Sequence, residues 1–177
     1  MDVVSEDLRY PIGGFVCPAN VPKAELDEAI ATLAALPGQL RDVVGTMSET
    51  QVDPPYRDGG WTVRQLVHHI ADSHLNALIR VKRALTEDWP TIKSYNEKAW
   101  AELADSKAPV AWSLNLIENA HARWVVLLQS LEEAQWQRGF LHPERGGSTL
   151  EQATLLYQWH SKHHLAHIVN LRKRMNW

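Results

Sequence analysis

The sequence predicts an all-α fold in which four long helices form a bundle. Long stretches of the chain repeat apolar residues every three or four positions, which is typical of helices that bury one face. Segments rich in proline and glycine separate these stretches, and no stretch alternates apolar and polar residues as a half-buried strand does. One connection is unusually long. Together these observations predict a four-helix bundle with a long crossover between helices 2 and 3.

The chain begins with residues 1–21, which are expected to form an irregular N-terminal arm because prolines and glycines interrupt them. Residues 22–177 are expected to form a single domain, since their number suits one hydrophobic core. The first helix is predicted to begin near Pro22, a residue that suits the first turn. Its apolar repeat over residues 26–47 resumes in phase after Pro37–Gly38, which indicates one kinked helix.

Two further helices begin with the capping-box pattern, a Ser or Thr followed three residues later by Glu or Gln. Thr62–Gln65 fits this pattern and predicts a helix over about residues 62–85. Ser148–Glu151 also fits it and predicts the last helix over about residues 149–174.

The rest of the chain supplies the connections and one more helix. Residues 88–109 form the long crossover, and a connection of this length suits a chain that crosses the bundle or lines a site. A helix is predicted from near Pro109 to Leu131 by its apolar repeat. Residues 51–60 and 139–147 are expected to form loops, because both contain proline and paired glycines.

Composition and charge disfavour several classes of protein. The net charge is −3, with both signs mixed along the chain, which gives no electrostatic basis for binding nucleic acid. No apolar run approaches the length of about 18 residues that spans a membrane, and residues 1–9 lack the pattern of a signal peptide. The single cysteine, Cys17, excludes an intramolecular disulfide. We therefore expect a cytoplasmic protein with no nucleic-acid partner and no membrane partner.

Histidine is the unusual feature of the composition: of nine in the chain, four lie within residues 159–168. His160 and His164 are four residues apart, as are His163 and His167, so each pair lies on one face of a helix. Two imidazoles in this arrangement can hold one metal ion. The same spacing also fits a polar face on a surface helix. A zinc protease is disfavoured, because the stretch lacks the glutamate of H-E-x-x-H.

A helical wheel separates these four histidines. His160 and His164 share a face with apolar residues, so they need a metal ion or hydrogen-bond partners. His163 lies further round the helix, toward its polar side. His167 lies beside His160 and is a candidate supporting partner.

A third ligand is expected from another helix, because metal sites in bundles join side chains of facing helices. The second helix offers His68, His69 and His74. The wheel favours His74, in the middle of the apolar stripe, although core-facing histidines are more often hydrogen-bonded to their neighbours. His69 lies on a polar stripe, where a solvent-accessible cleft would admit a catalytic metal. His121 lies in the apolar stripe of the third helix, where a hydrogen-bonded core histidine is more common than a metal ligand. It is also a candidate for a residue that supports a ligand by hydrogen bonding to it.

Several long motifs resemble the YfiT family, which belongs to the DinB-like superfamily of metal-binding four-helix bundles. The motifs are Tyr10–Gly13, Pro55–Gln65, Val67–His74, Glu97–Trp100, His121–Trp124 and Trp159–His164. The likeness runs from about Tyr10 to the C-terminus, so it covers nearly the whole chain. It implies one divalent metal per chain, zinc or nickel, held by three histidines.

The resemblance also implies which histidines hold the metal. The second residue of the His-His pair on the second helix corresponds to His69, and the H-x-x-x-H pair corresponds to His160 and His164. This assignment replaces the wheel's preference for His74. Three neutral imidazoles leave coordination positions open, which is the layout of a catalytic site.

The family implies a homodimer that acts on a small-molecule substrate as a metal-dependent hydrolase, with water as the activated nucleophile. Some members of the superfamily are instead thiol S-transferases that use bacillithiol or related thiols. Such a thiol would come from solution, because Cys17 is alone. A third hypothesis is a metal-binding stress protein without enzymatic activity. The general base is open among Asp72, Glu97, Tyr157 and His167.

Overall fold

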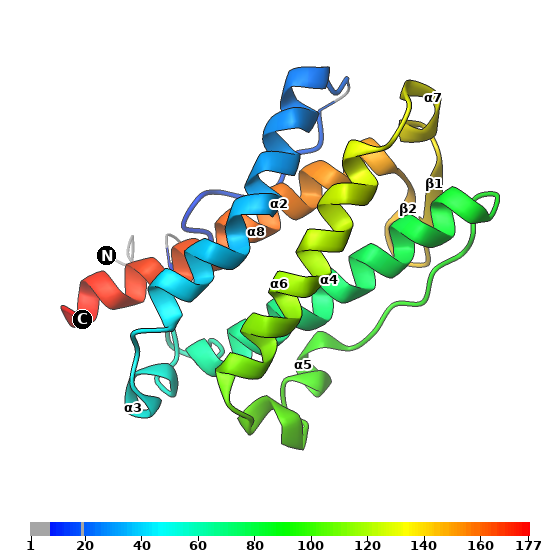
Figure 1. The fold of residues 1–177 in the computed structure, drawn as a ribbon. Helices are drawn as coiled ribbons and strands as arrows, with labels where there is room; N and C mark the ends of the chain where they lie inside the picture. Colours follow the sequence, from blue (N-terminus) through cyan, green and yellow to red (C-terminus); the bar gives the residue numbers. More distant parts are fainter. Residues whose placement is uncertain (1–7, 19) are drawn as a thin grey trace, which may run out of the picture.

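The computed structural model describes residues 8–18 and 20–177. Its four long helices are α2 (Lys23–Val44), α4 (Val63–Thr86), α6 (Val110–Gln129) and α8 (Leu150–Met175). They form the predicted four-helix bundle (Figure 1). Both α2 and α4 pack on α6 and α8, so α2 and α4 lie diagonally opposite each other. Within the described residues, no helix is long and apolar enough to cross a membrane.

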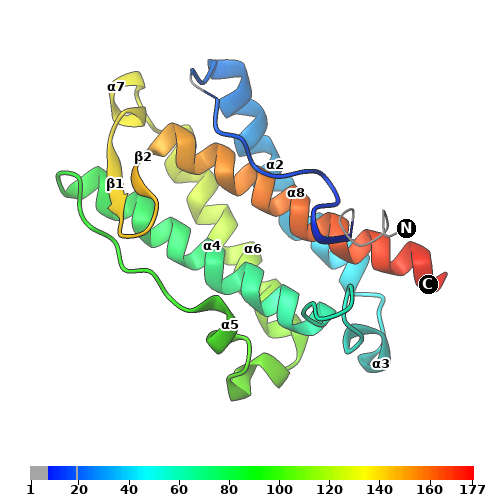
Figure 2. The ribbon, with the colours of Figure 1, turned by 180° about the vertical axis from the view of Figure 1, so that it is seen from behind.

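The expected N-terminal arm is described only in part, because its residues 1–7 and 19 lie outside the described residues. The part that follows residue 9 passes over α8 (Figure 2). The indole N–H of Trp159 in α8 donates to the carbonyl of Gly13 (3.1 Å), and the ring of Tyr10 lies 6.0 Å from that of His163. This segment therefore covers one face of α8.

The predicted crossover occupies residues 87–109, between α4 and α6. It contains two short helical segments, α5 (Glu97–Trp100) and η1 (Ala104–Lys107). The crossover runs along the outside of α4, so α4 and α6 begin at the same end of the bundle (Figure 2). Side chains of α4 hold it in place: Gln65 donates to the carbonyl of Ala101 (3.0 Å), and His68 bonds to the carbonyl of Ala108 (3.1 Å).

The prediction that residues 139–147 form a loop is wrong, because this segment belongs to an antiparallel hairpin. Its strands are β1 (Gly139–His142) and β2 (Gly146–Thr149). The amide of Leu141 donates to the carbonyl of Pro90 (3.0 Å), and the amide of Ile92 donates to the carbonyl of Leu141 (2.9 Å). Such short, glycine-containing strands carry no periodic signal, and they depend on these bonds to the crossover.

A few element ends also differ from the prediction. Pro22 and Pro109 stand before the first helical residues, and Thr149 caps α8 one residue later than the capping-box pattern predicted. Two short helices were not predicted, α3 (Glu49–Val52) and α7 (Glu133–Trp136), and α3 reaches into the first expected loop. The helix α2 continues through Pro37 as one helix, as predicted, and the kink at this position stays a prediction.

Replacing Thr149 with alanine is expected to lower the free energy of unfolding by about 1 kcal/mol. The Thr149 hydroxyl accepts from the amide of Gln152 (3.3 Å), which has no helical partner once that oxygen is removed. Urea denaturation measures the loss. Thr86→Ala is the control, because the exposed Thr86 hydroxyl bonds only to carbonyls of its own helix. Its expected effect is below about 0.5 kcal/mol, and equal losses in the two variants would contradict the capping role.

Two apolar clusters fill the bundle. The first includes Leu36, Leu40, Leu66, Ile70, Leu114, Ile117 and Ile168. The second includes Leu33, Leu78, Val81, Trp124, Leu128, Leu150 and Tyr157. On α4, α6 and α8, a histidine separates the residues of the two clusters: His74, His121 and His160, which we call the histidine layer. His74 and His121 are fully buried and His160 is partly buried, so the middle of the core is polar.

Candidate metal centre

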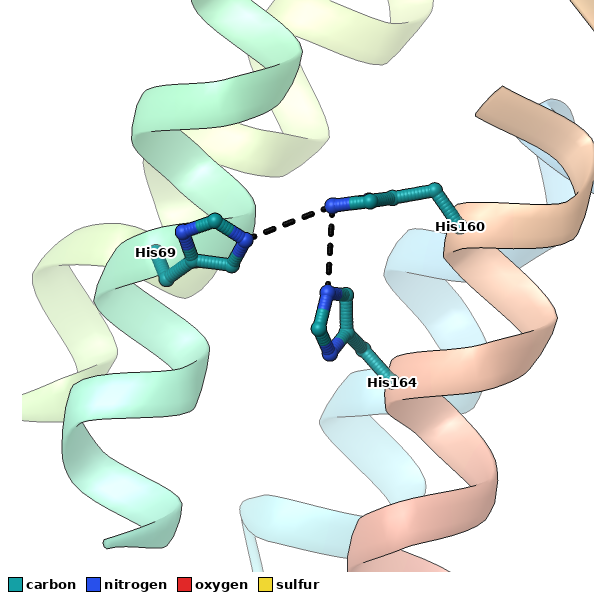
Figure 3. A group of neighbouring side chains, drawn as sticks. All are labelled: His69, His160 and His164. Atoms are coloured by element: carbon teal, nitrogen blue, oxygen red, sulfur yellow. Dashed lines mark hydrogen bonds between the residues drawn. The ribbon is translucent and has the colours of Figure 1, made fainter. Parts of the chain in front are cut away.

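His69 of α4 meets His160 and His164 of α8 between the two helices (Figure 3). The Nε2 atom of His160 lies 3.3 Å from Nε2 of His69 and 3.0 Å from Nε2 of His164. One ring nitrogen of each residue lies within 4.8 Å of the other two. The structure therefore brings together the three histidines that the family resemblance implies as metal ligands.

Each of these three side chains projects from a regular α-helix. The helix α4 begins at a capping box formed by Thr62 and Gln65, so His69 lies well inside a helix whose start is fixed. His160 and His164 are one turn apart in the middle of α8, and their ring centroids are 4.2 Å apart. Side chains on helices are held more precisely than side chains on loops, which favours a site of defined geometry.

The spacing and protonation of these nitrogens fit a divalent metal. The nitrogen ligands of a tetrahedral ion with metal–nitrogen bonds of 2.0–2.1 Å are about 3.3 Å apart, close to the 3.3 Å and 3.0 Å that separate His160 Nε2 from Nε2 of His69 and of His164. A ligand imidazole must be neutral. Burial lowers the pKa of His69 to about 4, and burial together with the neighbouring histidines lowers the pKa of His160 and of His164 well below the usual value. All three rings therefore offer a lone pair at neutral pH.

The surroundings of His69 differ from the expected polar stripe beside an open cleft. His69 is only 6% exposed, and the ring of Trp61 lies 4.6 Å from its own ring. His164 is also buried, and His160 alone among the three is partly exposed. The wheel misjudged this face because it treats each helix alone, whereas Trp61 comes from the loop before α4.

His74 and His121 lie behind His160 and do not join the three facing nitrogens. His74 Nε2 lies 3.0 Å from His160 Nδ1, and His74 Nδ1 lies 2.7 Å from His121 Nε2. His121 Nδ1 in turn donates to the carbonyl of Leu33 (2.6 Å). Both residues are therefore core histidines bonded to their neighbours, and the wheel's preference for His74 as the third ligand does not match this geometry.

A second group of nearby ring nitrogens consists of His163, His164 and His167. His163 Nε2 and His167 Nε2 are 3.0 Å apart. The prediction that His163 faces the polar side is wrong, since it is 7% exposed, and His167 pairs with His163 and not with His160. The ring of Tyr56 stacks on His167 at 4.0 Å, so loop residues cover this face of α8. The H-x-x-x-H spacing of the pair was the signal for this second group.

The four general-base candidates lie in different environments. Burial and nearby Asp105 raise the pKa of Asp72 to about 6, so this carboxyl titrates close to neutral pH. Burial also raises the pKa of Glu97 in the crossover. The Tyr157 hydroxyl donates to the carbonyl of Ser73 (3.2 Å), and His167 belongs to the second group. Asp72 is thus a candidate whose protonation changes close to physiological pH.

Comparison with known proteins identifies the family. The model of the DinB superfamily matches residues 32–168. The chain belongs to the DinB superfamily. Within it, the chain is 50% identical over 172 residues to a Bacillus mycoides protein and 52% identical over 171 residues to a Bacillus cereus protein, covering 97% of this chain and 99% of each relative. Both relatives are provisionally named metal-dependent hydrolases.

The solved structure of YfiT from Bacillus subtilis also resembles this chain closely. The TM-score is 0.94 at 50% sequence identity, and the match covers 97% of this chain and 99% of YfiT. YfiT is described as a probable metal-dependent hydrolase with an unusual four-helix bundle topology. The resemblance to the YfiT family and the bundle fold are therefore confirmed.

Proposed function

We propose that this DinB-superfamily protein is a metal-dependent hydrolase of a small-molecule substrate, in which His69, His160 and His164 hold one divalent ion. The observation that carries the proposal is the convergence of three neutral Nε2 atoms from two helices. The provisional names of its relatives support the same activity. Zinc and nickel both suit imidazole ligands. The homodimer and the cytoplasmic location that the resemblance implies stay predictions beside this proposal.

The chain's own residues prepare such a site for hydrolysis. When bound, a divalent ion lowers the pKa of a water molecule to about 7 and so supplies a nucleophile at neutral pH. Three protein ligands leave room for water and substrate, whereas a closed structural site uses four. Burial keeps the three imidazoles neutral, and His160 is the most exposed residue of the three.

Thiol transfer uses the same three ligands and differs in the nucleophile. The exposed Cys17 is the only cysteine of the chain, so a thiol substrate would come from solution. The test therefore compares two reactions of the zinc-loaded and nickel-loaded protein: hydrolysis of a panel of nitrophenyl esters and phosphate esters, and consumption of chlorodinitrobenzene with and without added bacillithiol.

We expect ester hydrolysis that needs the metal, does not need the thiol, and falls at least about 100-fold in His69→Ala. His142→Ala is a control outside the site, because His142 lies in the hairpin. Electrophile consumption that requires bacillithiol, without any hydrolysis, would replace the proposal with thiol transfer. No turnover in either reaction, with metal bound, would support a metal-binding protein without activity.

A further inference from the structure

The carbonyl of Leu33 in α2 lacks its usual helical partner. In an α-helix this carbonyl accepts from the amide of the residue four positions later, which here is Pro37, and proline has no N–H. His121 Nδ1 donates to the Leu33 carbonyl at 2.6 Å. Leu33 is 0% exposed and His121 is 1% exposed, so water is not an alternative donor. The proline in α2 thus leaves a buried acceptor that a histidine of α6 satisfies.

This bond determines the proton position on the next two histidines. A neutral imidazole carries one N–H and one lone pair, and a carbonyl only accepts. His121 therefore has its proton on Nδ1 and its lone pair on Nε2. His74 Nδ1, 2.7 Å from that lone pair, must carry the proton of His74. The lone pair of His74 is then on Nε2, which lies 3.0 Å from His160 Nδ1.

His160 is the last member of the chain. Its Nδ1 must donate to His74, so the lone pair of His160 is on Nε2. That nitrogen is the one that faces His69 and His164. Both rings are buried, and each must accept a hydrogen bond at Nε2, which only a neutral imidazole can do.

We propose that Pro37, His121 and His74 form a relay of positioning residues that holds His160 in the Nδ1–H tautomer, with its Nε2 lone pair aimed at the metal position. The tautomer order follows from hydrogen bonds alone, whereas its use in metal binding rests on the proposed metal site. His164 has no comparable support, because its buried Nδ1 has no hydrogen-bond partner within the described residues. The relay therefore orients His160, whose Nε2 lies next to Nε2 of both His69 and His164.

The first test needs no substitution. Two-bond nitrogen–proton couplings in NMR spectra of the metal-free, 15N-labelled full-length protein report the tautomer of each histidine. We expect His121, His74 and His160 all to carry their proton on Nδ1. A proton on Nε2 of any of the three in the neutral form would overturn the relay. This result does not depend on whether the protein binds metal or hydrolyses anything.

The second test measures zinc affinity by competition with a chelator. His121→Leu removes the first donor and is expected to weaken zinc binding about 10–100-fold, with the number of bound ions unchanged. In the same variant, we expect His160 to lose its single tautomer. Leu128→Ala is the control for lost stability, because Leu128 is a buried core residue of α6 outside the relay. Its zinc affinity is expected to match that of the unaltered protein.

The outcomes separate the relay from the proposed function. Unchanged zinc affinity in His121→Leu, or an equal loss in Leu128→Ala, would overturn the positioning role. Failure of the unaltered protein to bind zinc or nickel would instead overturn the proposed metal site. If His121→Leu does not fold, Pro37→Ala is the replacement variant. The new alanine amide can donate to the Leu33 carbonyl, which is expected to weaken the bond from His121 Nδ1 to that carbonyl. An unchanged chemical shift of the His121 Nδ1 proton in Pro37→Ala would contradict the role of the proline.

Discussion

Replacing His69 with alanine is expected to remove most of the bound metal, whereas replacing His167 with alanine is expected to retain it. The two histidine groups share His164, so only the residues outside the overlap distinguish them. His69 is the one member of either group that comes from α4. Without it, the proposed site keeps two imidazoles, and we expect the affinity to fall by more than about 100-fold, beyond the usual effect of removing an outer partner.

Elemental analysis after purification without chelator measures this difference, with about one ion expected per unaltered chain. His167→Ala is a well-matched control, since His167 is also a buried histidine with a second imidazole 3.0 Å away. His164→Ala should lose the metal whichever group binds it. Loss in His167→Ala together with retention in His69→Ala would assign the ion to the second group and contradict the proposed ligands.

Acidifying the metal-free protein from pH 7 to pH 5 is expected to lower its free energy of unfolding by several kcal/mol. Burial lowers the pKa of His69 to about 4, of His163 to about 4 and of His167 to about 3, while an unfolded histidine titrates near 6.5. Below pH 6.5 the unfolded chain therefore binds protons that the folded chain does not. Stability is complete above that pH and falls as the pH decreases toward 4.

The size of this effect is large compared with the stability of a typical domain. At pH 5 each of these three histidines contributes a loss of about 2 kcal/mol, so together they remove about 6 kcal/mol of a usual total of about 5–15 kcal/mol. Asp72 acts in the opposite direction, because its raised pKa of about 6 lets the folded chain bind a proton first. One half-buried carboxyl only makes the decrease of the free energy of unfolding with falling pH less steep.

Urea denaturation at pH 7, 6 and 5, followed by circular dichroism, measures the predicted loss. A saturating concentration of zinc should move the loss to lower pH, because the ion binds only the neutral imidazoles of the folded chain. A free energy of unfolding that stays constant from pH 7 to pH 5 would show that the histidines titrate normally in the folded state. That outcome would contradict their burial as the cause of the low pKa values.

Much of the fold could be predicted because local patterns determine it. The apolar repeats and the capping box at Thr62 predicted the helices, and the long connection predicted the crossover. The hairpin at residues 139–149 could not be predicted in this way, because bonds between Leu141 and the crossover stabilise it. The diagonal arrangement of α2 and α4 likewise depends on how faces of different helices meet.

The candidate site was predictable only in part. Periodicity correctly placed His74 and His121 in the core, but it could not show that they bond to each other and to His160. His69 came from the family resemblance. The wheel assigned His163 to the polar side because the residues that cover it, such as Tyr10, belong to a distant part of the sequence.

The histidine layer also has a consequence for the alignment of the helices. Two apolar helix faces can shift by one turn along each other and still bury a similar area. A buried polar group, in contrast, needs a hydrogen-bond partner at the matching position along the neighbouring helix. A shift of α8 by one turn relative to α4 would take His160 away from His74 and leave buried nitrogens without partners. We therefore expect the layer to fix the register of α4, α6 and α8 along their axes, by favouring one of several registers that bury similar apolar surface.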